Sequence, residues 1–313
     1  MSGVSAALAI VVVVFAYLVW PAVLPGLIYS PRALGTAGLS PESWGYDGEV
    51  LRIPVPPGDT IVGWMLRHTS SKPNGCVVLF THGNAGNVTS HAGFMRPFLA
   101  TGFDALVFDY RGYGASSGQA SEVHLYEDAQ VAYGYLVNEG IDPDHLLVVG
   151  HSLGTAVATE LASRQESAGL VLAAPFASLP DAMRMRVPWF PVGLLRWTRE
   201  RFDSESRIAE VSAPTLFVVA SADRIVPKAS ARALYESARG QKTWLEVPGG
   251  HNDVFRNGEF RAALERFRHL LPACSSAAID SSNVEWSSQP AAPSELAFVP
   301  ASSARSPLSL PGK

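Results

Sequence analysis

The sequence contains little charge, few cysteines and no excess of basic residues. Of its 313 residues 17% are charged and two are cysteines, and the formal net charge is −4. Because there is no basic excess to neutralise phosphates, we expect no nucleic-acid partner. Cys76 opens an apolar run and Cys274 lies in a serine-rich stretch, so the pattern argues against a disulfide framework and suits a reducing compartment.

Several chemical motifs are also missing from the chain. It has no zinc-binding helix motif, no P-loop and no dinucleotide-binding fingerprint, so we predict neither a metal nor an organic cofactor. It has no internal repeat, and nothing in it indicates an oligomeric state. Apolar side chains make up 47% of the residues, which is enough to bury the core of one large domain or of two smaller ones.

The N-terminal stretch lacks charge altogether. No charged side chain occurs from Val4 to Tyr29, and about 20 apolar residues in a helix cross the hydrocarbon core of a bilayer. We interpret residues 1–30 as a retained single-pass membrane anchor, with a cleaved signal peptide and a buried core helix as alternatives. A signal peptide usually begins with basic residues, and none precedes Arg32. Arg32 and Arg52 follow the stretch, which leans towards a cytoplasmic catalytic domain.

The C-terminal stretch, residues 272–313, is rich in Ser, Ala and Pro and has no sustained periodicity. It cannot bury enough apolar surface to offset the entropy cost of ordering it, so we predict a disordered tail. The two terminal stretches leave residues 31–271 for the catalytic domain.

Within this domain, short β-branched runs alternate with helical patterns. Strands are predicted at residues 50–55, 61–68, 76–82, 104–110, 145–150, 169–174, 214–220 and 243–248. Helices are predicted at residues 88–101, 121–139, 153–165, 228–239 and 252–271. The first two strands form an antiparallel pair, and the later apolar strands are typical of a parallel sheet covered on both faces. We therefore predict an α/β fold with an eight-stranded, mostly parallel sheet and reactive groups at the carboxyl ends of its strands.

One serine stands where such a strand meets a helix. In "LLVVGHSLGTAVATELA" (146–162) the apolar run ends in Ser152, which two glycines flank, and a helical pattern follows. A sharp strand-to-helix turn would project the hydroxyl above the sheet, and Gly150 and Gly154 would fit where strand and helix crowd together. The alternative is an ordinary glycine turn. We predict that Ser152 is a nucleophile.

A serine nucleophile needs a base and an acid that orients the base. His251, in "VPGGHND", follows the last predicted strand, and Asp223, in "VVASADRIVP", follows the strand before it. Both loops are expected at the same sheet edge as Ser152, in the chain order that this turn requires. Asp203 and Asp253 are the rival acids, although Asp253 is expected to serve the start of its own helix.

The negative charge of a tetrahedral intermediate needs preorganised donors. The backbone N–H of Leu153 directly follows the nucleophile, and we assign the second donor to the N–H of Asn84 in "THGNAGN" (81–87). Among the other histidines, His68 and His91 are expected at the surface.

With these motifs in place, the chain resembles an α/β-hydrolase, and most closely the small-capped, membrane-associated serine hydrolases that include protein depalmitoylases and monoacylglycerol or lysophospholipid lipases. The resemblance covers residues 48–271 and rests on "HGNAGN" (82–87), "DYRGYGASSG" (109–118), "GHSLG" (150–154), "SADRIVP" (221–227) and "GGHND" (249–253). It implies that Ser152 is the nucleophile, His251 the general base and acid, and Asp223 the orienting acid. It also implies that the amides of Asn84 and Leu153 form the oxyanion hole.

An insertion after the sixth predicted strand, residues 175–207, is expected to form a short helical cap over Ser152. Its Trp189, Phe190 and Trp197 are candidate contacts for an acyl chain, or they only pack the cap onto the body. Together these features predict a serine hydrolase acting on carboxylic esters or thioesters of acyl lipids or acylated proteins. The alternatives are a serine peptidase of the same fold and a catalytically silent membrane-tethered binding protein.

Overall fold

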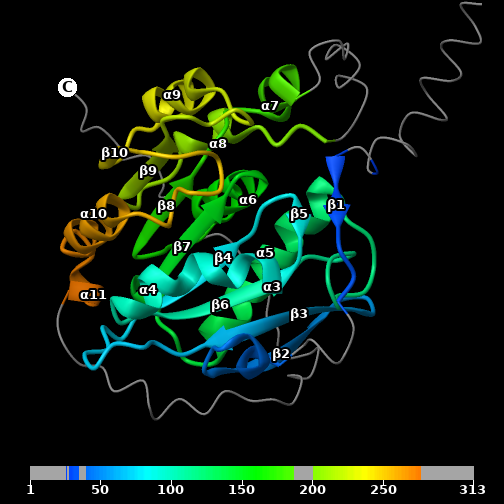
Figure 1. Cartoon of the computed structure of the whole chain (residues 1–313). Coiled ribbons are helices and arrows are strands. Elements are labelled where there is room, and N and C mark those ends of the chain that lie inside the picture. Colours follow the sequence, from blue (N-terminus) through cyan, green and yellow to red (C-terminus); the bar gives the residue numbers. More distant parts are fainter. Residues whose placement is uncertain (1–25, 27, 35–39, 187–199, 276–313) are drawn as a thin grey trace, which may run out of the picture.

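An eight-stranded sheet crosses the molecule (Figure 1). The structure is a computed structural model that describes residues 26, 28–34, 40–186 and 200–275. The sheet has the order β10-β9-β8-β7-β4-β6-β3-β2. Its strands are β2 (Gly48–Val55), β3 (Asp59–Leu66), β4 (Val77–Thr81), β6 (Asp104–Asp109), β7 (Leu146–His151), β8 (Gly169–Ala173), β9 (Thr215–Ala220) and β10 (Lys242–Val247). Strand β3 is antiparallel to both of its neighbours, and every other neighbouring pair is parallel. The predicted eight-stranded, mostly parallel sheet is confirmed.

Helices connect the strands and cover the sheet on both faces (Figure 1). The α-helices are α3 (Val88–His91), α4 (Arg96–Ala100), α5 (Glu122–Asn138), α6 (Leu153–Arg164), α7 (Leu179–Arg186), α8 (Ser204–Ile208), α9 (Lys228–Ser237), α10 (Gly258–Arg268) and α11 (Pro272–Ser275). Within the described ranges the 3-10 helices are η3 (Pro41–Trp44), η4 (Ala92–Met95) and η5 (Pro143–His145). Two short strands, β1 (Ser30–Pro31) and β5 (Ala85–Gly86), pair in parallel with each other and form a separate two-stranded sheet.

The two faces of the sheet can be followed along β4. Val77 and Leu79 belong to the core that α5 and α6 cover, whereas Val78 and Phe80 belong to the core that α4 and α10 cover. Successive side chains of a strand point to opposite faces, so a strand covered on both faces must be apolar throughout. All five residues of β4 are buried, which explains the continuous apolar run in the sequence.

Four parallel strands of this sheet end at the same edge. The loops after β4, β7, β9 and β10 carry Asn84, Ser152, Asp223 and His251 respectively. Residues far apart in the chain are therefore brought to one edge of the sheet, as expected for a site at the carboxyl ends of parallel strands.

The last long helix begins later than predicted, at Gly258 rather than at residue 252. The side chain of Asn257 accepts a hydrogen bond from the N–H of Phe260 at 2.8 Å and caps the helix. Asp253, expected at the helix start, instead accepts a hydrogen bond from the N–H of Gly250 at 2.9 Å. Its carboxylate therefore closes the tight loop around His251.

The expectation that the cysteines are unpaired is wrong. Cys76 and Cys274 form a disulfide across a sequence separation of 198 residues, and both are buried. Helix α11 carries Cys274 back against the body, so residues 272–275 belong to the folded domain rather than to a disordered tail. The predicted tail from residue 276 onward lies outside the described residues. A buried disulfide removes the reason for expecting a reducing compartment.

The predicted membrane anchor, residues 1–30, lies mostly outside the described residues. Within the part of the chain that the structure describes, no helix is both long and apolar enough to cross a membrane. The end of the predicted anchor belongs to the catalytic domain, because Ile28 and Tyr29 are buried in its core and Ser30 begins β1.

Candidate active site

Ser152 occupies a sharp turn between β7 and α6. Its φ of 51° and ψ of −119° place it in a backbone conformation that residues with side chains rarely adopt. The turn is fixed on both sides: the N–H of Ser152 donates to the carbonyl of Ala173, and its own carbonyl accepts from the N–H of Thr155, each at 2.9 Å. The conformation lifts the hydroxyl out of the sheet edge, as the sequence pattern predicts.

The glycines on either side of Ser152 are required by space. A Cβ on Gly154 would lie 2.0 Å from the carbonyl oxygen of Thr81, and one on Gly150 would lie 2.5 Å from the carbonyl oxygen of Gly154. Both obstacles are backbone atoms, which cannot rotate away. A side chain at Gly154 would push α6 off the end of β4, one at Gly150 would push it off β7, and either would move Ser152.

His251 lies between Ser152 and Asp223. Its Nε2 is 2.9 Å from the Oγ of Ser152, and its Nδ1 is 2.8 Å from the Oδ2 of Asp223. Since an ionised carboxylate only accepts hydrogen bonds, Nδ1 carries the proton and Nε2 is free to accept the hydroxyl proton of Ser152. The three predicted residues thus meet as a hydrogen-bonded chain, and the rival acids do not enter it: Asp203 caps α8 and Asp253 bonds Gly250.

The surroundings of Asp223 keep its carboxyl group ionised, as its hydrogen bond from His251 requires. Burial opposes its ionisation, but the hydrogen bond and charge of His251 and the N–H groups of Val226 and Ile225 outweigh it, so its pKa lies below the usual value. The two N–H groups donate to Oδ1 at 3.0 and 2.8 Å, which leaves Oδ2 for the imidazole.

His151, directly before the nucleophile, holds the loop of His251 and was not singled out from the sequence. Its Nε2 is 3.3 Å from the backbone carbonyl of His251. Burial, followed by the nearby charge of His251, lowers the pKa of His151 well below its usual value. The ring is therefore neutral and can donate its Nε2 proton to that carbonyl. Its place inside "GHSLG" is the only sequence signal that could have pointed to this role.

The loop expected to carry the second oxyanion donor is braced from two directions. The Tyr113 hydroxyl donates to the backbone carbonyl of Asn84 at 2.8 Å, and the N–H of Ser30 donates to the Asn84 side-chain oxygen at 3.2 Å. Asn84 and Leu153 line the same pocket as Ser152. Tyr113 comes from the "DYRGYGASSG" segment (109–118).

A buried polar layer lies beneath the site. His82 is fully buried and stacks on His91, with ring centroids 4.9 Å apart, so the surface position expected for His91 is wrong. Burial lowers the pKa of both rings and raises that of neighbouring Asp109 to about 8. Among the described residues, no group of three or more His, Cys, Asp or Glu side chains is arranged to hold a metal ion.

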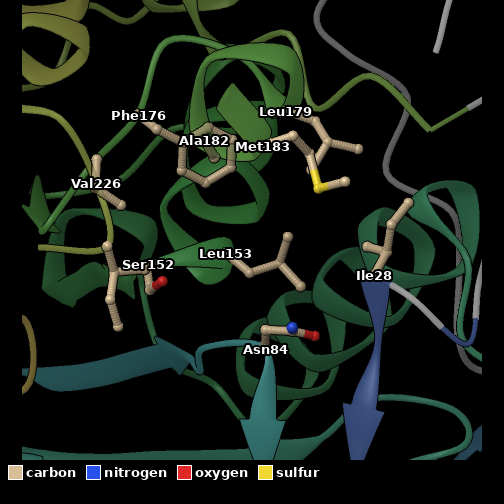
Figure 2. Close-up of a pocket in the computed structure, with 10 residues that line it drawn as sticks. Ile28, Asn84, Ser152, Leu153, Phe176, Leu179, Ala182, Met183 and Val226 are labelled. Atoms are coloured by element: carbon tan, nitrogen blue, oxygen red, sulfur yellow. The ribbon is translucent and has the colours of Figure 1, made fainter. Parts of the chain in front are cut away.

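A mostly apolar pocket opens beside the nucleophile (Figure 2). Its volume is about 540 Å³, counting the part open to solvent. It is lined by Ile28, Asn84, Ser152, Leu153, Phe176, Leu179, Ala182, Met183, Ile225 and Val226. Helix α7 of the predicted cap contributes Leu179, Ala182 and Met183.

The predicted chain contacts of the cap are Trp189, Phe190 and Trp197, and all three lie outside the described residues. Ile28 also lines the pocket, although the sequence placed it in the membrane anchor. Its own signal, an apolar side chain in an apolar run, could not have separated it from its neighbours.

Comparison with known proteins points to one family. The sequence pattern of the alpha/beta hydrolase fold family matches residues 77–203. An uncharacterized protein of Mycobacterium tuberculosis is 38% identical over 208 residues, which is 66% of this chain and 73% of that protein. The alpha/beta hydrolase domain-containing protein aho-3 of Caenorhabditis elegans is 36% identical over 202 residues, 62% of this chain and 57% of the relative.

The fold itself recurs in solved structures. A Pyrococcus furiosus esterase superposes with a TM-score of 0.60 at 18% identity, over 77% of this chain and 97% of the esterase. At that identity the likeness concerns the fold alone. Taken with the relatives above and the observed sheet, it leads to one assignment: the chain belongs to the alpha/beta hydrolase fold family.

Proposed function

We propose that this protein is a serine hydrolase that cleaves carboxylic ester or thioester bonds of acyl lipids or acylated proteins. The observation that carries the proposal is the hydrogen-bonded chain from Ser152 through His251 to Asp223, with contacts of 2.9 and 2.8 Å. A serine hydroxyl becomes a nucleophile when a base can take its proton, and His251 is placed to do so.

In the proposed reaction, the Oγ of Ser152 attacks the substrate carbonyl carbon while its proton passes to the Nε2 of His251. The N–H groups of Asn84 and Leu153 stabilise the negative oxygen of the tetrahedral intermediate. Collapse breaks the bond to the alcohol or thiol, which leaves with the proton from the imidazolium. Asp223 stays ionised throughout and stabilises the imidazolium.

The second half of the reaction reverses these roles. Water gives a proton to Nε2 of His251 and its oxygen attacks the acyl-enzyme carbonyl, forming a second tetrahedral intermediate. When this collapses, the imidazolium returns the proton to the Oγ of Ser152 and the free acid leaves. Each turnover consumes one ester or thioester and one water, and it needs no further reactant.

An acyl chain is the proposed occupant of the pocket. Ligand sites combine an apolar lining with a few placed polar groups, and here the polar groups stand at Ser152 and Asn84 while the rest of the lining is apolar. Trp189, Phe190 and Trp197 are proposed as further chain contacts.

Membrane attachment through the uncharged N-terminal stretch is part of the proposal, because a substrate with a long acyl chain resides in a lipid surface. Removing the stretch should shift the protein from the membrane pellet to the supernatant. A suitable variant begins at Gly26, since one that begins at Ser30 would also delete Ile28 and Tyr29 from the core. Equal partition of both proteins would contradict the attachment.

The test of the function is turnover of p-nitrophenyl acyl esters and acyl thioesters by the full chain and by Ser152→Ala. We expect hydrolysis by the full chain and a loss of at least about a thousandfold in the variant. Hydrolysis of peptide anilides in place of esters would favour the peptidase. Absence of any turnover by folded protein would leave only a binding protein with this fold.

A further inference from the structure

The last two residues of the uncharged N-terminal stretch and the three that follow form a short strap, defined as Ile28–Arg32, that lies along the loop carrying Asn84. Strand β1 of the strap pairs in parallel with β5, so that Ser30 lies opposite Ala85. Figure 1 shows the strap running beside β5 at the edge of the molecule. The strap is therefore bound to the loop that the proposed mechanism uses for its oxyanion donor.

The strap is held along its whole length. At its end, the N–H of Arg32 donates to the carbonyl of Gly86 at 3.1 Å, and the carbonyl of Arg32 accepts from the Asn87 side chain at 3.1 Å. Nearer its start, the buried hydroxyl of Tyr29 donates to the carboxylate of Glu200. Backbone and side-chain bonds together fix where Ile28 stands.

Ile28 is buried, with 4% of its surface exposed, and its side chain lines the pocket. Figure 2 shows Ile28 and Ser152 at opposite ends of the pocket, with Leu153 and Asn84 between them. An acyl chain whose carbonyl lies at Ser152 would run past Leu153 and meet Ile28 with its far end. Because the strap is hydrogen-bonded to Gly86 and Asn87, an acyl chain cannot push Ile28 aside without breaking the pairing of β1 with β5.

We infer that Ile28 determines the length of acyl chain that the site accepts. The inference rests on the proposed function and adds the substrate class to it: acyl esters or thioesters whose chain fills the pocket from Ser152 to Ile28. A residue read from the sequence as membrane anchor thereby becomes a specificity-determining residue. One methylene too many or too few in an apolar pocket changes kcat/KM by about tenfold or more.

Two opposite substitutions in the full chain test the inference. The kcat/KM of p-nitrophenyl acetate, octanoate and palmitate is measured in one detergent for each protein. Ile28→Trp fills the far end, so the octanoate-to-acetate and palmitate-to-acetate ratios should each fall by about tenfold or more. Ile28→Ala opens it, so the palmitate-to-octanoate ratio should rise. Leu270→Trp, at an exposed position two residues after α10, is the matched control and should keep all ratios.

The outcomes separate the inference from the proposed function. If the wild-type chain hydrolyses none of the three esters, the proposed function fails and takes the inference with it. If it hydrolyses them while the ratios of both Ile28 variants stay within about twofold of wild type, only the role of Ile28 is overturned. Should Ile28→Trp not fold, as judged by its melting curve, Ile28→Ala alone decides in the same way.

Discussion

The tautomer of the His251 imidazole depends on the carboxylate of Asp223. This carboxylate accepts the Nδ1 proton of His251 through one oxygen and two backbone N–H groups through the other. An asparagine at this position could present its amide nitrogen to the imidazole, which would stabilise the wrong tautomer. The proposed mechanism therefore requires a carboxylate here and not merely a polar side chain.

We expect Asp223→Asn to lower kcat by about 10⁴-fold, because Nε2 of His251 would then carry a proton and could not accept that of Ser152. Asp203→Asn is the matched control, since asparagine caps a helix as well as aspartate does and Asp203 caps α8. Ester hydrolysis at saturating substrate measures both. Equal rates for the two variants would remove Asp223 from the mechanism.

A second prediction at the residue scale concerns the pH dependence of stability that the buried His91 causes. Burial lowers the pKa of His91 in the folded protein, while its pKa in the unfolded chain is about 6.5. Its contribution to stability is therefore complete above pH 6.5 and is lost as the pH falls, because the unfolded chain then binds a proton that the folded protein does not.

We expect His91→Gln to make the loss of unfolding free energy below pH 6.5 shallower, by up to about 1.4 kcal/mol per pH unit. Urea unfolding of both proteins from pH 7 to pH 5 measures the slope. The opposing effect of Asp109, whose raised pKa favours the fold at low pH, is present in both proteins and cancels. Parallel slopes would show that His91 takes up its proton while folded.

Residue types and their order were enough to predict that Ser152, Asp223 and His251 meet, because each follows an apolar strand whose end is visible in the sequence. His151 and Tyr113 could not be predicted in the same way. Each acts on a backbone carbonyl of a residue distant in the chain, and sequence spacing carries no information about that contact.

At the scale of elements, the β7–α6 turn is where the site depends most on close packing. Gly154 lies where α6 crosses the end of β4, and its missing Cβ lets the helix approach the carbonyl of Thr81. Overpacking against backbone atoms cannot be relieved by a rotamer change. Steric need, rather than chemistry, therefore fixes the glycines around Ser152.

We expect Gly154→Ala to destabilise the fold by about 3 kcal/mol or more and to abolish turnover. Gly134→Ala in α5 is the matched control: its added Cβ meets no atom within 4 Å. Alanine is the better helix former, so this variant should gain about 1 kcal/mol. Urea unfolding measures both. A tolerated Gly154→Ala would mean that α6 can move away without loss.

Strands were predicted better than helix starts. The buried parallel strands could be predicted because such strands form nearly continuous apolar runs, as β4 and β7 do. The start of α10 was missed because Asn257, not Asp253, supplies the cap, and either side chain could do so.

At the scale of the whole molecule, the disulfide between Cys76 and Cys274 is the contact that could not be predicted from the sequence. It joins the start of β4 to the end of the described chain, and α10 and α11 bring Cys274 there. A sequence separation of 198 residues does not show whether two cysteines can pair, because pairing depends on the distance between them in the fold.

Breaking this bond should cost about 2–5 kcal/mol, because it constrains a long loop in the unfolded chain. The expected result is a lower urea midpoint when reductant is added to the wild-type protein. The double variant Cys76→Ala/Cys274→Ala should start from a lower midpoint and not respond to reductant. A wild-type midpoint that reductant leaves unchanged would argue that the thiols are not joined in solution.

The most direct measurement of the central claim is covalent labelling of the full chain by an alkyl fluorophosphonate, read by mass spectrometry of the intact protein and of its peptides. We expect one phosphonyl group on the folded protein, attached to Ser152, and none on His251→Ala or on heat-denatured protein. A folded, unlabelled wild-type protein, or a label on another residue, would contradict the central claim.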